Sequence, residues 1–380
     1  MKLGIVANEF FDAPAGRAGG FGWAARQVAE CLNGGSNFGV EAVYVTNWPR
    51  IIDNAGDAIH GVRLLKKREG SRRDLWNLWR ERIDLLLAID YRPNYRAVFT
   101  ALPFTPIIVW VRDPRTPQDV VKVNTLRIPG AEDRPQGIDP VDCTSLGKVA
   151  SQSRWLRRRL LFATPAPHLA ANVPATYGVN AQDVEFLPNI IDFDPGTVVK
   201  SEKPRAVFLG RLDPIKRPWL VVELARRHPE VEFLVLGQAH FSGKGAWKPE
   251  DVPDNLRLLG HTEGRDKVRI LASSWVLINT SIHEALAVSF LEALKCETPL
   301  LSCQDPGGLV SRFGIYVGRW DGAGMEALDK FSEGLTRLLA DRSLRVRLGK
   351  EGRDWVTRTH NRAAFLSSFR ELCRRAGAWR

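Results

Sequence analysis

Several features that assign a chain to a known class of protein are missing from this sequence. It has 5 cysteines in 380 residues, and they are scattered without the paired spacing of a zinc site. An odd, dispersed set argues against a disulfide framework and favours the reduced thiols of a cytosolic protein. No apolar run approaches the length of a membrane span, and the N-terminus lacks a signal-peptide pattern. We therefore expect a cytoplasmic protein.

Nucleic-acid signatures are missing as well. There is no zinc-finger spacing, no aromatic RNA-binding signature, no internal repeat and no low-complexity tract. The net charge of +11 suits anionic partners such as phosphates or an acidic membrane surface. Because the excess of Lys and Arg is spread over both halves of the chain, a dedicated nucleic-acid arm is not expected, and we predict no nucleic-acid partner.

The length of the chain favours two domains, since 380 residues exceed one ordinary core. Short apolar segments alternate with helical patterns through most of the chain, which is typical of parallel sheets with helices on both faces. The predicted class is α/β. The expected strands are 3–8, 40–46, 84–91, 106–111, 161–164, 184–188, 206–210, 231–237, 256–260, 275–280, 299–302 and 315–318, and three helices, 325–339, 343–357 and 362–376, close the chain.

A Gly-rich turn follows the first expected strand and precedes a helix at 23–32. Glycines let a backbone approach a ligand closely, and the start of a helix offers free amides. The turn is not a G-x-x-x-x-G-K-[ST] phosphate loop, and a flexible connector is the structural alternative. Its candidate ligand-binding residues are Gly19, Gly20, Phe21 and Gly22.

Two basic segments lie in the first half, at 63–82 and 154–159. The first interleaves Trp76 and Trp79 with its charges. One interpretation is a solvated helix face whose aromatic side chains anchor it in the core. The other is peripheral contact with an acidic lipid surface at the inner face of a membrane.

Charged residues also follow the expected strand at 106–111. Arg112 and Asp113 stand where the sheet would present its carboxyl edge, meaning the edge formed by the carboxyl ends of its strands. A structural ion pair and contact with a substrate are both open. Residues 125–147 lack periodicity and are expected to form a surface loop that could touch an acceptor.

The second half opens on a strand, a turn and a helix. Arg211 and Lys216 are five residues apart at the carboxyl end of that strand. Two cations there could clamp a diphosphate, the guanidinium as a fork and the ammonium as a point charge. Two ordinary surface cations are the structural alternative.

Two carboxylates, Glu284 and Glu292, bracket the start of an apolar helix that follows the strand at 275–280. Ser289, Glu292 and Lys295 form one narrow polar stripe on that helix. The amides at the helix start would suit an anion. The alternative is that the stripe is the solvated edge of a packed helix.

These motifs resemble those of the retaining GT-B glycosyltransferases, the group 1 type that uses nucleotide sugars. Glu284 and Glu292 reproduce the E-x7-E element, and G-R-L-x-x-x-K at 210–216 is similar to the motif for the donor diphosphate. The turn at 19–22 resembles the family's first glycine loop. After Glu284, the family's Gly-aromatic-Gly is replaced here by Ala-Leu-Ala.

The resemblance implies two Rossmann-like domains that face each other across a cleft. Residues 1–195 would bind the acceptor, 196–357 would bind the nucleotide sugar, and the helix at 358–380 would pack back on the first domain. A sugar would pass from a UDP- or GDP-sugar to a glycan, lipid-linked or small-molecule acceptor with retention of anomeric configuration. No cofactor or metal would be required.

The resemblance also implies roles for individual residues. Arg211 and Lys216 would neutralise the departing diphosphate, Glu284 would hold the donor sugar, and Glu292 would bind the ribose hydroxyls. Arg112 and Asp113 would lie by the acceptor. The remaining donor-binding residues would be Gly19, Gly20, Phe21, Gly22, Gly210, Gly260, His261, Leu286, Ala287 and Val288.

Two other functions are open. One is a nucleotide-sugar epimerase on the same fold, and the other is a basic protein that binds anions or nucleic acid without catalysis. The two carboxylates together with the Arg/Lys pair favour chemistry over binding alone.

Overall fold

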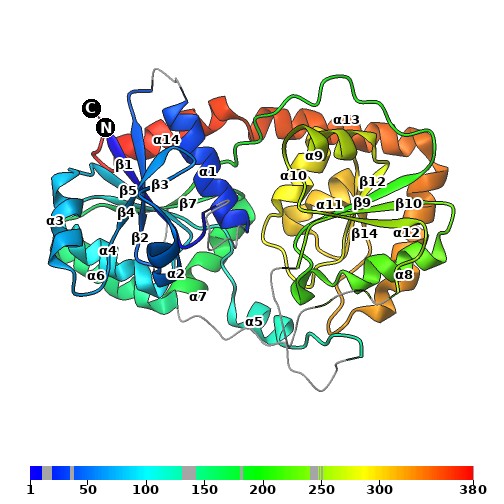
Figure 1. The fold of residues 1–380 in the computed structure, drawn as a ribbon, viewed down its shortest axis with the longest axis horizontal. Coiled ribbons are helices and arrows are strands. Elements are labelled where there is room, and N and C mark those ends of the chain that lie inside the picture. Colours follow the sequence, from blue (N-terminus) through cyan, green and yellow to red (C-terminus); the bar gives the residue numbers. More distant parts are fainter. Residues whose placement is uncertain are drawn as a thin grey trace. The chain divides into compact units, whose positions relative to one another are not determined.

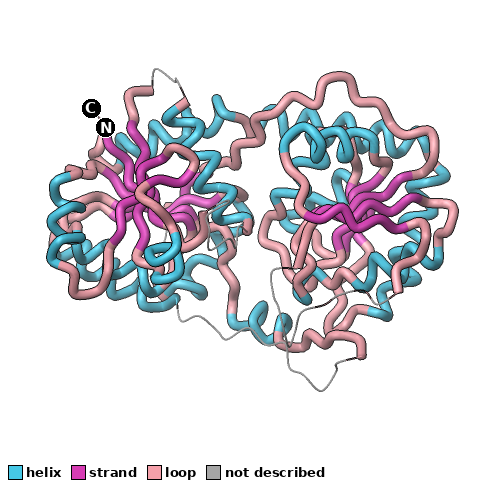
Figure 2. Tube along the Cα trace, in the orientation of Figure 1, coloured by secondary structure: helices cyan, strands magenta, loops and turns pink. Residues whose placement is uncertain are grey.

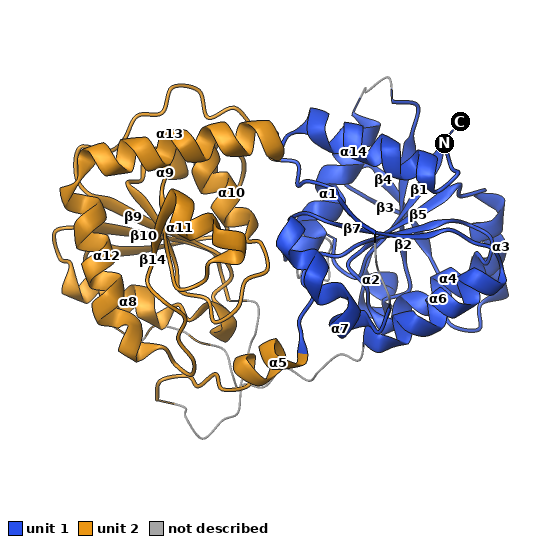
Figure 3. Ribbon diagram, turned by 180° about the vertical axis from the view of Figure 1, so that it is seen from behind, with its two compact units in different colours: residues 1–116, 140–190, 361–380 blue, residues 117–139, 191–360 orange. Residues whose placement is uncertain are grey.

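The structure is a computed structural model that describes residues 1–10, 19–34, 38–130, 143–179, 183–239, 247, 249 and 251–379. The chain divides into two compact units, drawn in different colours in Figure 3. Unit 1 comprises residues 1–116, 140–190 and 361–380, and unit 2 comprises 117–139 and 191–360.

Unit 1 is built on a sheet whose strands run in the order β3-β4-β2-β1-β5-β6-β7-β8. All neighbours pair in parallel except β3 and β4. Helices flank the strands in Figure 2, which explains why β5 (Leu85–Ile89) is apolar and buried along its whole length. The other strands are β1 (Lys2–Val6), β2 (Glu41–Thr46), β3 (Ala58–Ile59), β4 (Val62–Lys66), β6 (Ile107–Trp110), β7 (Leu160–Thr164) and β8 (Val184–Phe186).

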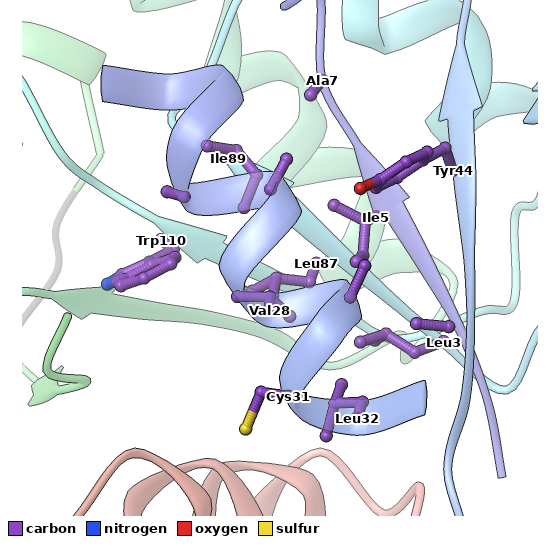
Figure 4. Close-up of a cluster of buried hydrophobic side chains, with 14 of the residues drawn as sticks. Leu3, Ile5, Ala7, Val28, Cys31, Leu32, Tyr44, Leu87, Ile89 and Trp110 are labelled. Atoms are coloured by element: carbon purple, nitrogen blue, oxygen red, sulfur yellow. The ribbon is translucent and has the colours of Figure 1, made fainter. Parts of the chain in front are cut away.

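The helices of unit 1 bury one apolar face each. Helix α1 (Gly20–Asn33) places Val28 and Leu32 against the sheet, where Leu3, Ile5 and Leu87 meet them (Figure 4). The other helices of this unit are α2 (Pro49–Asn54), α3 (Arg72–Arg80), α4 (Arg96–Ala101), α6 (Leu146–Trp155), α7 (Val173–Tyr177) and α14 (Arg362–Arg375).

The last helix of the chain, α14, belongs to unit 1 although it follows all of unit 2. Phe365, Phe369 and Leu372 are at most 1% exposed and lie in the same core cluster as Phe38 and Trp110. The ring of Phe365 lies 5.9 Å from that of Trp110. This burial fastens the C-terminal segment to the first sheet.

Unit 2 has a parallel sheet in the order β11-β10-β9-β12-β13-β14. Figure 1 shows helices around this sheet. The strands are β9 (Arg205–Leu209), β10 (Glu232–Leu236), β11 (Leu256–Gly260), β12 (Val276–Asn279), β13 (Leu300–Ser302) and β14 (Gly314–Tyr316). The helices are α5 (Pro117–Val123), α8 (Trp219–Arg227), α9 (Gly264–Ser273), α10 (Val288–Lys295), α11 (Leu309–Phe313), α12 (Leu328–Ala340) and α13 (Arg342–Thr359).

The segment 117–130 departs from the expected division of the chain at residue 195. It lies between β6 and β7 in sequence, but Val123, Leu126 and Ile128 are buried in the core of unit 2. Thr125 accepts a hydrogen bond from the amide of Gly322 at 3.0 Å. Of the expected surface loop at 125–147, residues 125–130 therefore belong to unit 2, whereas Cys143 and Leu146 are buried in a core cluster of unit 1.

Strand order reverses once in each sheet, between β1 and β5 in unit 1 and between β9 and β12 in unit 2. Connections leave such a pair in opposite directions, so ligands of doubly wound sheets bind beyond the carboxyl ends of these strands. Ligand sites are therefore expected beyond the carboxyl ends of β1 and β5 and of β9 and β12.

The described helices include none with both the length and the apolar composition needed to cross a bilayer. All five cysteines are buried free thiols. The α/β class with two parallel-sheet units is confirmed. Strand β4 was not expected, because its residues form the start of the basic segment at 63–82.

Candidate functional site

The candidate site lies at the carboxyl ends of β9 and β12 in unit 2. Lys216 ends a short 3-10 turn after β9, and Glu284 lies in the loop between β12 and α10. The Nζ atom of Lys216 donates to Oε1 of Glu284 at 2.5 Å. The strand reversal thus joins two predicted site residues that are 68 positions apart in sequence.

The carboxylate of Glu284 sits in a nearly closed set of donors. Its side chain is 9% exposed. The same Oε1 atom accepts from Nδ2 of Asn279 at 2.9 Å and from Oγ of Ser281 at 2.6 Å. Burial alone would raise the pKa of Glu284, but Lys216 and these hydrogen bonds outweigh it and lower the pKa. Glu284 is therefore held as an ionised acceptor.

Arg211 extends from the end of β9 beside a buried carboxylate. Its Nε atom lies 2.8 Å from Oδ2 of Asp213, and the two side chains are 35% and 5% exposed. Neither oxygen of Asp213 accepts a hydrogen bond within the described residues. The contact is thus an ion pair in which Asp213 contacts Nε of the partly exposed Arg211 side chain.

Three glycines meet at the neighbouring strand ends. The amide of Gly237 donates to the carbonyl of Gly260 at 2.7 Å. The amide of Gly210 donates to the carbonyl of Leu236 at 3.0 Å. A Cβ on Gly237 would lie 1.8 Å from the carbonyl oxygen of Gly210, and its φ is +151°. Only glycine fits at 237, and the backbones of the predicted residues Gly210 and Gly260 both touch it.

Arg217, directly after Lys216, is fully buried at 0% exposure. Its guanidinium donates to the carbonyls of Thr280 at 2.7 Å and Ser281 at 3.3 Å, which follow β12. It also donates to the carbonyl of Trp320 at 3.0 Å and to Sγ of Cys303 at 3.1 Å. One side chain thereby ties together the loops after β12, β13 and β14.

Helix α10 carries the second carboxylate. Its N-cap residue, Ala287, offers no side-chain acceptor to the amides of the first turn, so these amides remain suited to an anion. Glu292 is 5% exposed, which excludes a solvated edge. Its Oε1 atom accepts from Nζ of Lys267 in α9 at 2.6 Å.

The two histidines near the site differ. His261, a predicted donor-binding residue, is 46% exposed in its side chain and lies 3.9 Å from Glu263. His283 is 9% exposed, and its Nδ1 atom lies 3.9 Å from Asp119 in α5, which also pairs with Arg319 at 3.1 Å. No group of three or more metal-binding side chains occurs in the part of the chain that the structure describes.

The predicted residues of unit 1 occupy the carboxyl edge of its own sheet. Gly19 is the N-cap of α1, which contains Gly20, Phe21 and Gly22. Arg112 is 6% exposed, stacks on Trp110 at 4.4 Å, and donates to Asn189 at 2.8 Å. Asp113 pairs with Arg115 at 2.7 Å.

Several residues of the site were not predicted. Asp213, Arg217, Gly237, Lys267, Asn279 and Ser281 carry no motif, and each becomes significant only through a contact across the sheet. Asp213 lies between Arg211 and Lys216 in sequence and Arg217 directly follows Lys216, and this proximity was the one available signal.

Comparison with protein families finds a match over the part of the chain that holds this site. Residues 191–355 match the family model described as Glycosyl transferases group 1. Most of unit 2 is therefore similar to a group 1 glycosyl transferase domain. Arg211, Lys216, Glu284 and Glu292 all lie within the matched residues.

One curated relative is similar to part of this chain. The chain is 25% identical over 138 residues to a component of human phosphatidylinositol N-acetylglucosaminyltransferase, a match covering 34% of this chain and 28% of that protein. The likeness thus spans about a quarter of the curated relative.

Solved structures show the fold over the whole chain. A sucrose-phosphate synthase from Thermosynechococcus elongatus superposes with a TM-score of 0.72 at 16% identity, covering 99% of each chain. Anabaena HepE in complex with UDP-glucose gives a TM-score of 0.66 at 12% identity, covering 99% of this chain and 100% of HepE. The chain has the GT-B fold with two Rossmann-like domains, as the sequence motifs predicted.

Proposed function

We propose that this protein is a glycosyltransferase that moves a sugar from a nucleoside diphosphate sugar to an acceptor, with retention of anomeric configuration. The observation that supports it best is the Lys216–Glu284 pair at the strand reversal of unit 2, with Arg211 at the end of the same strand β9, in the residues that match the group 1 model. The sugar-transferring relatives favour this function over an epimerase or a basic binding protein.

In the proposed reaction, the bond between the anomeric carbon and a diphosphate oxygen breaks. A bond from that carbon to an acceptor oxygen forms, and the proton of the acceptor hydroxyl passes to the departing diphosphate. Negative charge develops on the leaving diphosphate, where Arg211 and Lys216 would stabilise it. An ammonium has three donors, so Lys216 can keep its bond to Glu284 while it contacts a phosphate oxygen.

The other residues would hold the donor. Glu284 would accept from the sugar hydroxyls, since its second oxygen accepts no bond in the described residues. The amides of Leu286, Ala287 and Val288 would face the diphosphate. Glu292 would accept from the ribose hydroxyls, with Lys267 holding its carboxylate from the other side.

Glu292→Gln tests the ribose contact. A neutral amide is a poorer acceptor, and a charge-assisted hydrogen bond is worth roughly 1.5–3 kcal/mol. We expect affinity for the preferred nucleoside diphosphate, UDP or GDP, to fall by about tenfold to a hundredfold. Arg211→Ala should lower affinity for the nucleoside diphosphate and leave affinity for the bare nucleoside unchanged. Calorimetric titration with nucleoside and diphosphate measures both effects.

Lys267→Gln is the matched control, because it removes the ion pair and keeps the carboxylate of Glu292. It should change affinity for the diphosphate by no more than about threefold, below 1 kcal/mol. If Lys267→Gln weakens binding as much as Glu292→Gln does, the carboxylate acts only as a partner of Lys267 and the ribose contact is wrong.

We propose transfer without a divalent cation, because Arg211 and Lys216 supply the two positive charges that a diphosphate leaving group requires. Sugar transfer should proceed at an unchanged rate in the presence of EDTA. Loss of activity with the chelator, restored by magnesium or manganese, would show that the leaving group depends on a metal.

We also propose contact of unit 1 with an acidic membrane surface. Trp76 and Trp79 in α3 are 59% and 53% exposed, although the indole of Trp79 donates to the carbonyl of Ala101 at 2.7 Å. Trp155 at the end of α6 is 82% exposed. Exposed tryptophans beside cations favour an interface with anionic lipid.

Flotation with acidic liposomes at low salt should recover the protein, and neutral liposomes should not. Recovery should fall in Arg72→Glu/Arg73→Glu on α3 and persist in Arg269→Glu, a 79% exposed arginine of unit 2. Equal recovery with neutral and acidic lipid would remove the membrane contact.

A further inference from the structure

The carboxyl edge of the sheet in unit 1 gathers arginines from two adjacent strands. Arg92 follows β5, and Arg115 follows β6. Their side chains are 33% and 28% exposed. Strands β5 and β6 pair directly in parallel, with Ile89 opposite Trp110, so the segments that carry the two arginines leave the sheet from neighbouring strand ends. This edge adjoins the reversal between β1 and β5, where a ligand is expected.

Arg92 uses few of its donors. Within the described residues its guanidinium lies 3.8 Å from Asp90 and 5.4 Å from the ring of Phe21 in α1, and neither contact is a hydrogen bond. A guanidinium carries five N–H donors in a fork that matches phosphate oxygens. The exposed third of the Arg92 side chain therefore offers N–H donors near the start of α1.

The carboxylates of this edge are already engaged. Asp90 is 2% exposed, accepts from the hydroxyl of Tyr177 at 2.5 Å, and has its pKa raised by burial. Asp113 accepts from Arg115 at 2.9 Å. Glu9 accepts from the amide of Gly19 at 3.0 Å, at the N-terminus of α1. Asp90 and Glu9 have partners other than these arginines, whereas Asp113 engages Arg115 through Nε and Nη2, so the exposed part of Arg92 and the remaining N–H groups of Arg115 stay available.

A second observation points to an anion beneath this edge. Arg112 is 6% exposed, and its Nη1 atom is buried without a hydrogen-bond partner in the described residues. Burial lowers its pKa to about 10, an effect that Asp90 only partly offsets. A buried guanidinium that is under-neutralised adds positive potential at this edge of the sheet.

Amides suited to hydroxyl groups lie at the ends of the neighbouring strands. Asn8 after β1 and Asn94 after β5 exchange a pair of hydrogen bonds at 3.0 Å. Asn94 also donates to Asn47 after β2 at 2.9 Å. All three are partly exposed. Both amide hydrogens of Asn94 are used in these bonds, so Asn94 can only accept from a sugar or polyol, whereas Asn8 uses one amide hydrogen on Asn94 and can still donate the other.

We propose that Arg92 and Arg115 bind a phosphate group at this edge, and that the acceptor of the sugar carries that phosphate next to a hydroxyl-bearing part held by Asn8 and Asn94. The acceptor role rests on the proposed glycosyltransferase function. Arg112 and Asp113 then act as positioning residues, with Asp113 orienting Arg115 and Arg112 contributing charge from inside. The structural alternative is an ion-pair network that only closes the edge of the sheet.

Glycerol 3-phosphate titrated into the full-length protein at low salt tests the phosphate site by calorimetry. We expect saturable binding that weakens about tenfold in Arg92→Gln and in Arg115→Gln, the loss of one charge-assisted contact each. Arg82→Gln is the matched control, because Arg82 is exposed and precedes β5 at the opposite end of that strand. Thermal unfolding of each variant checks that the fold survives.

Three results would overturn the proposal. The first is absence of saturable binding of glycerol 3-phosphate into the millimolar range. The second is equal binding by the wild type and both edge variants. The third is loss of binding in Arg211→Ala alone, because this would place the phosphate in unit 2. Titration of the edge variants with UDP or GDP should be unchanged, so failure here is distinguishable from failure of donor binding.

Dihexanoyl phosphatidic acid, used below its micelle concentration, identifies the source of the phosphate. It shares the phosphate monoester of glycerol 3-phosphate and adds two short acyl chains. Tighter binding of the lipid, still dependent on Arg92, indicates a lipid acceptor. Equal binding of the two indicates a soluble phosphate.

Discussion

Replacing Lys216 by methionine is expected to abolish measurable sugar transfer and to destabilise unit 2. The variant removes the cation from Glu284, whose side chain is 9% exposed. A buried carboxylate that loses its partner costs about 3–5 kcal/mol, and the 21% exposure of Lys216 reduces the expected loss to about 2–3 kcal/mol. Urea unfolding measures the stability, and transfer from the preferred donor measures the activity.

The double variant Lys216→Met/Glu284→Gln separates the two effects. The amide can still accept from Asn279 and Ser281 but carries no charge, so most of the lost stability should return while transfer stays absent. If the double variant is as unstable as the single one, the loss comes from packing rather than from an uncompensated charge.

The deficit of Lys216→Met should depend on pH. In the wild type, burial alone would raise the pKa of Glu284, but Lys216 and the hydrogen bonds lower it. Stability from such a group is present above its unfolded-state pKa and is lost as pH falls through the folded-state pKa. Without Lys216 the pKa rises, so the difference from wild type should be largest near neutral pH and shrink under acid conditions.

Arg217→Met should cause the largest loss of stability among single changes in unit 2, about 4 kcal/mol. The side chain is fully buried and its donors satisfy carbonyls in the loops after β12 and β14. Each carbonyl left unpaired costs roughly 1–3 kcal/mol, and methionine cannot replace these donors. Donor affinity should fall as well, because Ser281 donates to Glu284 and Thr280 donates to the carbonyl of Lys216.

Arg269→Met is the control for this experiment, since Arg269 is 79% exposed in the same unit. Its effect should stay within about 0.5 kcal/mol. Urea unfolding of both variants provides the comparison. A loss of less than about 1 kcal/mol in Arg217→Met would mean that water or backbone movement replaces the guanidinium.

Some errors in the expected structure have a common physical cause. The segment 117–130 lacks the spacing of a long helix, so nothing in its residues indicated that Val123 and Leu126 are buried in the core of unit 2. Trp76 and Trp79 look like core anchors by composition, although both side chains lie on the exposed part of α3. Burial depends on what packs against an element, and that partner is distant in sequence.

The sequence by itself determined the α/β class, the two-sheet organisation and the carriers of the candidate chemistry, Arg211, Lys216, Glu284 and Glu292. Local signals suffice for these features, because buried parallel strands are short apolar runs and the motif residues follow strands directly. Only the tertiary structure decided which groups meet: Lys216 with Glu284, Arg211 with Asp213, Glu292 with Lys267, and Gly237 with Gly210. These partners come from different strands and helices, and the order of strands in a sheet brings them together without leaving a fixed spacing in the sequence.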